Sequence, residues 1–154
     1  MEPTVTTGQA ELDAVRIRRA ELLEALNRLE VSLAAPASGR AVVWGEQVHA
    51  ILVEIAEDFR AHIEVTEGPD GLHQAILAGD LRLTNAVEAL AAEHTPIADE
   101  IALLVAETEP PVTPQDVDIV RDQGTDLLSR LVRHRQRGAD LIYEAYQTDI
   151  GGRD

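Results

Sequence analysis

The chain contains neither cysteine nor lysine, and only 3% of its residues are aromatic. The absence of cysteine excludes disulfides, thiolate metal sites and cysteine nucleophiles. The absence of lysine excludes Schiff-base chemistry, because that reaction needs a lysine amine. With so few aromatic residues, a core must consist mainly of aliphatic side chains. No stretch reaches the length of about 18 apolar residues that a transmembrane helix requires, so we expect no membrane partner.

Acidic residues far outnumber basic ones, since 28 Asp and Glu residues against 13 arginines give a formal net charge of −15 at pH 7. Such a charge repels phosphate backbones, and we therefore expect no nucleic-acid partner. The N-terminal sequence "MEPTVTTGQAE" lacks the basic and apolar regions of a signal peptide, which predicts a cytoplasmic protein. A length of 154 residues predicts a single domain over residues 1–154.

Apolar residues recur at three- and four-residue spacing along most of the chain, which is the pattern of amphipathic helices. The pattern breaks at "APASG" and "GPDG", and Thr113 followed by Pro114 is a helix-start signal. The predicted helices span about residues 9–34, 41–67, 80–107 and 114–149, with a short disordered N-terminus and C-terminal tail. The link before the third helix can hold a short helix of its own. These features predict an all-α fold, an antiparallel up-down four-helix bundle.

Each predicted helix carries one strongly polar residue on its apolar stripe. These residues are Arg19, His62, His94 and His134. Cofactor sites in helical bundles are built from inward-facing side chains of neighbouring helices, so the four residues define the candidate site. His49 lies beside the stripe of its helix and His73 lies in a link between helices. We expect neither of them to take part.

The three stripe histidines occur in short motifs of their own: His62 in "HIEVTE", His94 in "EHTPI" and His134 in "HRQRGADLIYEAY". In number, order and placement these motifs resemble the hemerythrin-like, or HHE cation-binding, domain, over about residues 10–149. The resemblance implies a hemerythrin-like bundle that holds non-haem iron, one or two ions, through histidines and carboxylates. It also implies binding or sensing of oxygen, peroxide or nitric oxide. The ligands that it implies are the three histidines with Glu67, Asp140 or another nearby acid.

The motifs depart from the family pattern in two respects. The family has a carboxylate about one turn after its second-helix and last-helix histidines, where this chain has Thr66 and Gly138. Glu67 and Asp140 are the nearest acids, shifted around their helices by one and two positions. The first helix offers Arg19 where the family has a histidine, and a guanidinium cannot bind a metal ion. These differences predict a weakened or lost metal site.

The register of the predicted helices gives a separate expectation. With turn centres near residues 37, 74 and 110, His62 and His134 come to nearly the same level of the bundle. Arg19 and His94 share another level about seven residues away, on the order of 10 Å at 1.5 Å per residue. The two metals of a dinuclear cluster lie only about 3.5 to 4 Å apart. The register therefore predicts that the three histidines do not converge on one cluster.

Two functions stay open on the sequence. In the first, the bundle binds iron and a small ligand through the residues that the resemblance implies. In the second, it is a metal-free, degenerate bundle that acts as a protein-interaction or dimerisation module, and Arg19 and the histidines form a buried polar network. Such a network is stable only if its donors and acceptors are satisfied. An enzyme has little support, because no nucleophile and base occur at a recognisable spacing.

Overall fold

The computed structural model describes residues 7–151, and these residues form helices and connecting turns without a β-strand. The helices, in chain order, are α1 Thr7–Ala34, α2 Ala41–Glu67, α3 Leu72–Gly79, the 3₁₀ turn η1 Leu81–Leu83, α4 Thr84–Ala92, α5 His94–Thr108 and α6 Val117–Gly151. The protein is thus an all-α helical bundle. The disorder predicted for the two ends concerns residues 1–6 and 152–154, which lie outside the described residues.

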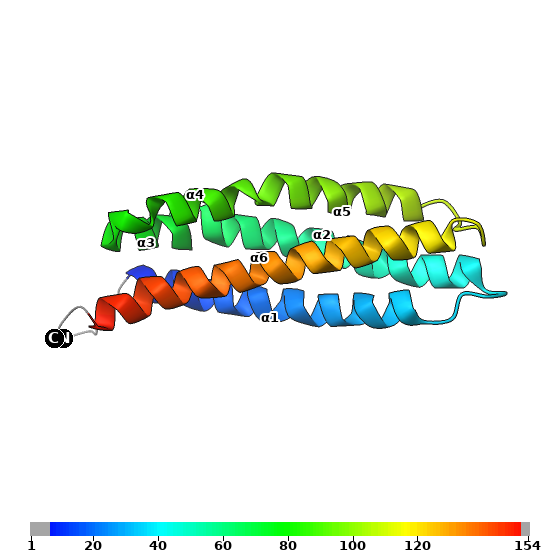
Figure 1. Cartoon of the computed structure of the whole chain (residues 1–154), viewed down its shortest axis with the longest axis horizontal. Coiled ribbons are helices and arrows are strands. Elements are labelled where there is room, and N and C mark those ends of the chain that lie inside the picture. Colours follow the sequence, from blue (N-terminus) through cyan, green and yellow to red (C-terminus); the bar gives the residue numbers. More distant parts are fainter. Residues whose placement is uncertain (1–6, 152–154) are drawn as a thin grey trace.

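The long helices lie side by side along the length of the molecule (Figure 1). α1 packs against α2 and α6, and α5 packs against the same two helices from the other side. The connections 35–40 and 109–116 lie at one end of the bundle, and α3 lies near the other (Figure 1). No helix within residues 7–151 is long and apolar enough to cross a membrane.

The third predicted helix, over 80–107, is two helices with a turn at Glu93 between them. Pro96 explains the break, because a proline nitrogen cannot donate to the carbonyl four residues earlier and its ring clashes with that carbonyl. A proline is tolerated in the first turn of a helix, so α5 starts at His94, two residues before it. The link 68–80 contains the short helix α3, as the sequence analysis allowed.

The interior is divided into two apolar clusters. The larger cluster surrounds Trp44, Leu127 and Ile101, and the smaller one surrounds Leu72 and Leu141. Arg121 of α6 covers the larger cluster at the C-terminal end of α1. Its Nε and Nη2 donate to the carbonyls of residues 33 and 35, at 2.9 and 2.7 Å. Its guanidinium also lies 5.2 Å from the centre of the Trp44 ring. The polar residues of the apolar stripes lie between the two clusters.

Candidate metal centre

One polar layer crosses the bundle between the two apolar clusters. On α6 the larger cluster ends at Leu131 and the smaller one begins at Leu141, and His134 lies between them. On the other three sides of the bundle the same gap is occupied by residue 19 of α1, residue 62 of α2 and residue 94 of α5. The stripe positions that the sequence singled out therefore form one level.

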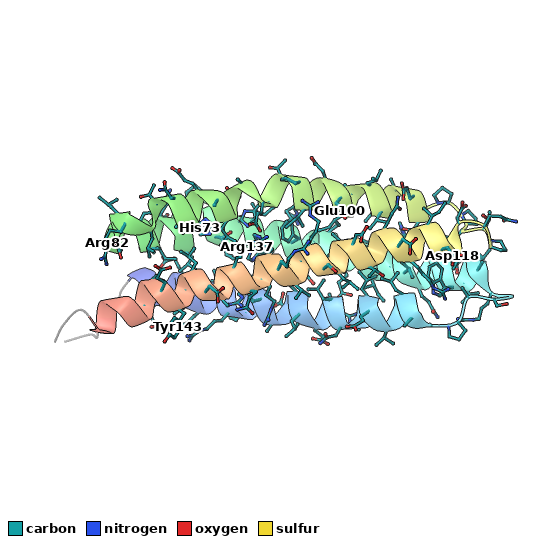
Figure 2. The ribbon with its side chains drawn as sticks, viewed as in Figure 1. His73, Arg82, Glu100, Asp118, Arg137 and Tyr143 are labelled. Atoms are coloured by element: carbon teal, nitrogen blue, oxygen red, sulfur yellow. The ribbon has the colours of Figure 1, made fainter. Side chains whose placement is uncertain are left out.

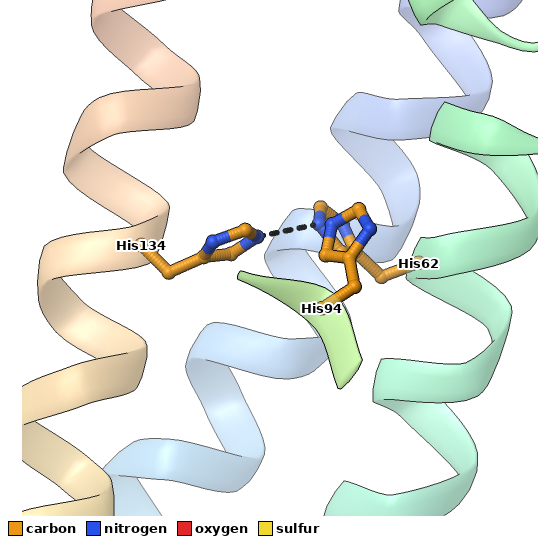
Figure 3. A group of neighbouring side chains, drawn as sticks. All are labelled: His62, His94 and His134. Carbon is orange, nitrogen blue, oxygen red and sulfur yellow. Dashed lines mark hydrogen bonds between the residues drawn. The ribbon is translucent and has the colours of Figure 1, made fainter. Parts of the chain in front are cut away.

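The three histidines of this layer converge. His62, His94 and His134 are all buried, and each offers a ring nitrogen such that these atoms lie within 4.8 Å of one another. The centres of the three rings are 4.9 to 5.4 Å apart. Figure 3 shows the closest approach, in which His62 Nε2 and His134 Nε2 are 3.3 Å apart. The group draws one imidazole from each of α2, α5 and α6.

The register prediction, which placed His94 about 10 Å from the other two histidines, is therefore wrong. His62 and His94 are level, so the turn between their helices is centred near residue 78, their mean, and not near residue 74. The residue level with His62 on the next helix lies as far after the turn centre as His62 lies before it. Moving the centre by four residues therefore moves that position by eight residues, or about 12 Å. The shift arises because α3 folds between α2 and α4 and lengthens the connection.

Two carboxylates hold two of the rings from outside the group. Glu67 forms an ion pair with His94 Nδ1, and Glu93 Oε1 lies 2.9 Å from His134 Nδ1. Arg137, labelled in Figure 2, pairs with the other oxygen of Glu93 at 2.8 Å. A carboxylate accepts a hydrogen bond from Nδ1–H, which leaves the lone pair of a neutral imidazole on Nε2. The Nε2 atoms of His94 and His134 are thereby prepared as acceptors or metal ligands.

Burial favours the neutral form of two of these histidines, His62 and His134. Burial first, and then the neighbouring histidines, lower the pKa of His62 to about 3. Burial also lowers the pKa of His134, although the hydrogen bond to Glu93 opposes the shift. For Glu93 itself, burial would raise the pKa, but hydrogen bonds from Arg137 and His134 lower it overall. Neutral imidazoles beside ionised carboxylates are the protonation states that metal binding requires.

Two nitrogen atoms of the group have no partner. His62 Nδ1 and His94 Nε2 are buried and form no hydrogen bond within the described residues. A buried polar atom without a partner costs about 1 to 3 kcal/mol, and native proteins contain few of them. A metal ion bound through His94 Nε2 would satisfy the lone pair of that atom, so the donor set fits a cation.

Two other residues that the sequence proposed lie differently. Asp140 is exposed and accepts a hydrogen bond from Gln136 at 2.9 Å, so the structure does not bring it to the histidines. Arg19 is half-buried on the level of the histidines, and its Nη2 donates to the main-chain carbonyl of Arg135 at 3.4 Å. Glu67 reaches the layer as a partner of His94 and not as one of the converging ligand atoms.

Three residues of the layer were missed by sequence reasoning. Glu93 precedes His94 in the "EHTPI" motif, and this adjacency was the signal that could have identified it. The Phe59 ring lies 5.6 to 5.8 Å from each of the three imidazoles, and it falls on the stripe one turn before His62. His73, labelled in Figure 2, is buried on α3 and stacks on His94 with ring centres 6.1 Å apart. Burial lowers the pKa of His73 to about 4.

A cavity of about 20 Å³ adjoins the histidines. Thr66 and Gly138, which follow His62 and His134 by four residues, both line it. The hydroxyl of Thr66 donates to the carbonyl of His62 at 2.8 Å, so it is directed to the backbone. A Cβ atom at Gly138 would meet only Leu90, at 3.9 Å. Gly138 thus leaves space beside the rings, sufficient for about one water-sized group.

The chain was also compared with models of protein families, with curated proteins and with solved structures, and none of these comparisons found a match. The meaning of the histidine layer therefore depends on its own geometry. Three buried imidazoles, two outer carboxylates and an adjoining cavity are the features that a functional account must explain.

Proposed function

We propose that this chain is a hemerythrin-like, antiparallel up-down four-helix bundle that binds one transition-metal ion through His62, His94 and His134. The placement of the connections at alternate ends of the bundle supports the up-down arrangement. The histidine order, with one imidazole each from the second, third and last long segments, supports the hemerythrin-like assignment.

The convergence of three buried imidazoles, with His94 Nε2 unpaired, carries the proposal. His62 Nε2 and His134 Nε2 are 3.3 Å apart. Two nitrogen ligands of one ion at tetrahedral angles lie about 3.3 Å apart when each metal–nitrogen bond is about 2.0 to 2.1 Å. The observed separation therefore suits two ligands of the same ion, and His94 Nε2 offers a third.

The donor set favours one ion and leaves it an open position. Three imidazoles suit iron, zinc, copper or nickel, and iron is the metal that the family resemblance implies. A second ion would need carboxylate ligands, but Glu67 pairs with His94 and Asp140 is exposed. When bound, such an ion supplies an open coordination position for a small ligand, for which oxygen, peroxide and nitric oxide are the candidates.

The residues around the ligands have separate tasks. Glu67 and Glu93 hold the Nδ1 protons of His94 and His134 and so fix the direction of their Nε2 lone pairs. Phe59 packs against all three imidazoles and excludes water from the side of the larger apolar cluster. Gly138 keeps open the space beside the rings in which a small ligand would lie.

The competing proposal is a metal-free bundle that acts as an interaction or dimerisation module. It has support in the hydrogen-bond distance between His62 and His134, which lets one Nε2–H donate to the other ring. It does not account for His94 Nε2, which is buried without a partner and which a bound metal ion would satisfy. For this reason we place metal binding first.

The test is metal content per chain, measured by elemental mass spectrometry on protein expressed without a His-tag in iron-supplemented medium, with an absorption spectrum. We expect about one ion per chain, lost in His94→Ala. His49→Ala is the matched control, because His49 is bonded to Thr108 at 3.0 Å in the larger apolar half. The metal-free protein is also incubated with Fe²⁺, Zn²⁺ or Co²⁺. If it then still holds less than about a tenth of an ion per chain, the result would support the metal-free module instead.

A further inference from the structure

A surface groove runs between α1 and α6, which lie side by side (Figure 1). Its volume is about 670 Å³, against about 20 Å³ for the cavity beside the histidines. Val132 of α6 lines the groove and is 56% exposed, so part of its apolar surface faces the solvent. The other large apolar residues of the groove are Leu23, Leu26 and Leu33 of α1 and Leu128 of α6.

The charge of the protein is distributed unevenly around the bundle. α1 and α6 together carry nine arginines and eleven acidic residues, a net charge of −2. α2 and the segment 72–108, which contains α3, α4 and α5, together carry two arginines and twelve acidic residues, a net charge of −10. Two copies of a chain with a net charge of −15 repel each other, and they do so least where their nearly neutral α1 and α6 sides meet.

Two contacts set the level of α1 against α6 along the groove. A Cβ atom at Gly124 would lie 2.8 Å from the side chain of Leu33. Arg19 Nη2 donates to the carbonyl of Arg135 at 3.4 Å. Between these two contacts residue numbers fall along α1 while they rise along α6. The two helices beside the groove therefore run in opposite directions, which is consistent with the up-down arrangement proposed above.

The groove carries opposite charges at two levels. Counted from the Leu33–Gly124 contact, Glu30 of α1 lies three residues along the groove, and Arg133 of α6 lies nine residues along it in the same direction. The two charges are thus six residues, or about 9 Å, apart along the helix axes. Arg121 also lines the groove, but its guanidinium donates to two main-chain carbonyls. A second copy laid on the groove in the reversed direction brings each Glu30 to the level of an Arg133.

The face formed by α1 and α6 has the size of a stable dimer interface. α1 has 28 residues and is therefore about 42 Å long. Two packed helices with axes about 9 Å apart form a face about 18 Å wide, which gives about 750 Å² here. Each partner of a stable complex buries about 800 Å². A single docked helix, about 10 Å wide, would cover only about half of this face.

We propose that a second copy of this chain binds to the groove between α1 and α6, and that the two copies run in opposite directions about a two-fold axis. The apolar residues of the two grooves pack together at the centre of the interface. Glu30 of each copy pairs with Arg133 of the other copy at the rim. None of His62, His94 and His134 lines the groove, so the association needs no metal and is independent of the proposed function.

The test is sedimentation equilibrium of the metal-free full-length chain, from micromolar to near-millimolar concentration. We expect a reversible equilibrium between monomer and dimer. Val132→Glu should weaken dimerisation by at least about tenfold, because the interface would bury an unpaired charge. Val53→Glu is the matched control and should leave dimerisation unchanged, since Val53 is exposed on α2. Circular dichroism verifies that both variants keep the helical content of the wild type.

An exchange of charges tests the reversed direction of the two copies. Glu30→Arg and Arg133→Glu should each weaken dimerisation by about tenfold, because each change brings like charges together at two places in the dimer. The double variant, Glu30→Arg with Arg133→Glu, should return to within about twofold of the wild type. Arg60→Glu, at an exposed position of α2, is the matched control for the change of charge.

Three results would overturn the proposal. The first is that the wild-type chain stays monomeric at the highest concentration, which would leave the groove to a segment of a different protein. The second is that Val53→Glu weakens dimerisation as much as Val132→Glu does. The third is that the double charge variant dimerises no better than its two single variants.

Discussion

The two halves of the bundle differ in how completely their buried ring nitrogens are satisfied. In the half around Trp44, the indole Nε1–H donates to the carbonyl of Ser32 at 2.8 Å, and His49 is paired with Thr108. In the half around the histidines, α4 and α5 are separate helices, buried ring nitrogens lack partners, and a cavity adjoins them. The comparison indicates that the first half provides most of the stability, whereas the second gives up stability where we propose a binding site.

The comparison is tested most strongly by removing the largest buried side chain of the apolar half. Trp44 is fully buried. Trp44→Ala should lower the free energy of unfolding by about 3 to 5 kcal/mol, the usual loss for a buried aromatic side chain. Urea unfolding followed by circular dichroism measures this loss. The fraction that stays folded should bind as much metal per chain as the wild type, and a parallel loss of metal would mean that the halves are not independent.

Metal binding should stabilise the protein only through the histidine half. At a free metal concentration about 100 times the dissociation constant, the wild type should gain about 2.7 kcal/mol of unfolding free energy. His94→Leu should gain none, because it lacks the third imidazole. The measurement is urea unfolding with and without Zn²⁺. A gain in His94→Leu equal to that of the wild type would contradict the assignment of His94.

The pH dependence of the metal-free protein should also arise in the histidine half. His62 titrates near pH 6.5 in the unfolded chain and at about 3 in the folded chain, because of its burial. The unfolded state therefore binds more protons between these values, and this contribution to stability is lost as the pH falls below about 6.5. Each such histidine contributes a slope of about 1.4 kcal/mol per pH unit. Urea unfolding between pH 7 and pH 5 should show this slope, and it should be smaller in His62→Leu.

The smallest effects should come from two glycines that sharpen the comparison. At Gly45 a Cβ would lie 2.6 Å from Val112 Cβ, whereas at Gly138 it would meet only Leu90, at 3.9 Å. Gly45→Ala should therefore destabilise the protein by about 1 to 3 kcal/mol through overpacking. Gly138→Ala should stabilise it by up to about 1 kcal/mol, since alanine is the better helix former. Thermal unfolding of the two variants checks the opposite signs.

Much of the fold could be predicted because helical periodicity is a local property of the sequence. The breaks after α1 and α2 follow from proline and glycine, and Arg19 and the histidines were recognised on the apolar stripes. The division of the third segment at Glu93 was not predicted, although Pro96 encodes it, because the apolar spacing continues across the break.

The convergence of the histidines could not be predicted from spacing. It depends on how α3 folds within the link, and a four-residue change in the turn centre moves His94 by about 12 Å relative to His62. The roles of Glu67 and Glu93 likewise depend on which side chains the folded helices bring together. Glu67 follows His62 by five residues and Asp140 follows His134 by six, but of these two acids only Glu67 contacts an imidazole of the layer.

The break at Glu93 has a consequence for the kinetics of binding. The segment from α3 to α4, residues 72–92, consists of short helices that pack against the continuous helices α1, α2 and α6, and its His73 stacks on His94. Short units with few buried contacts open more readily than the whole protein unfolds. We therefore expect metal to enter and leave through local opening of this unit, at a rate that Trp44→Ala leaves unchanged and that loss of the Glu93–Arg137 ion pair increases.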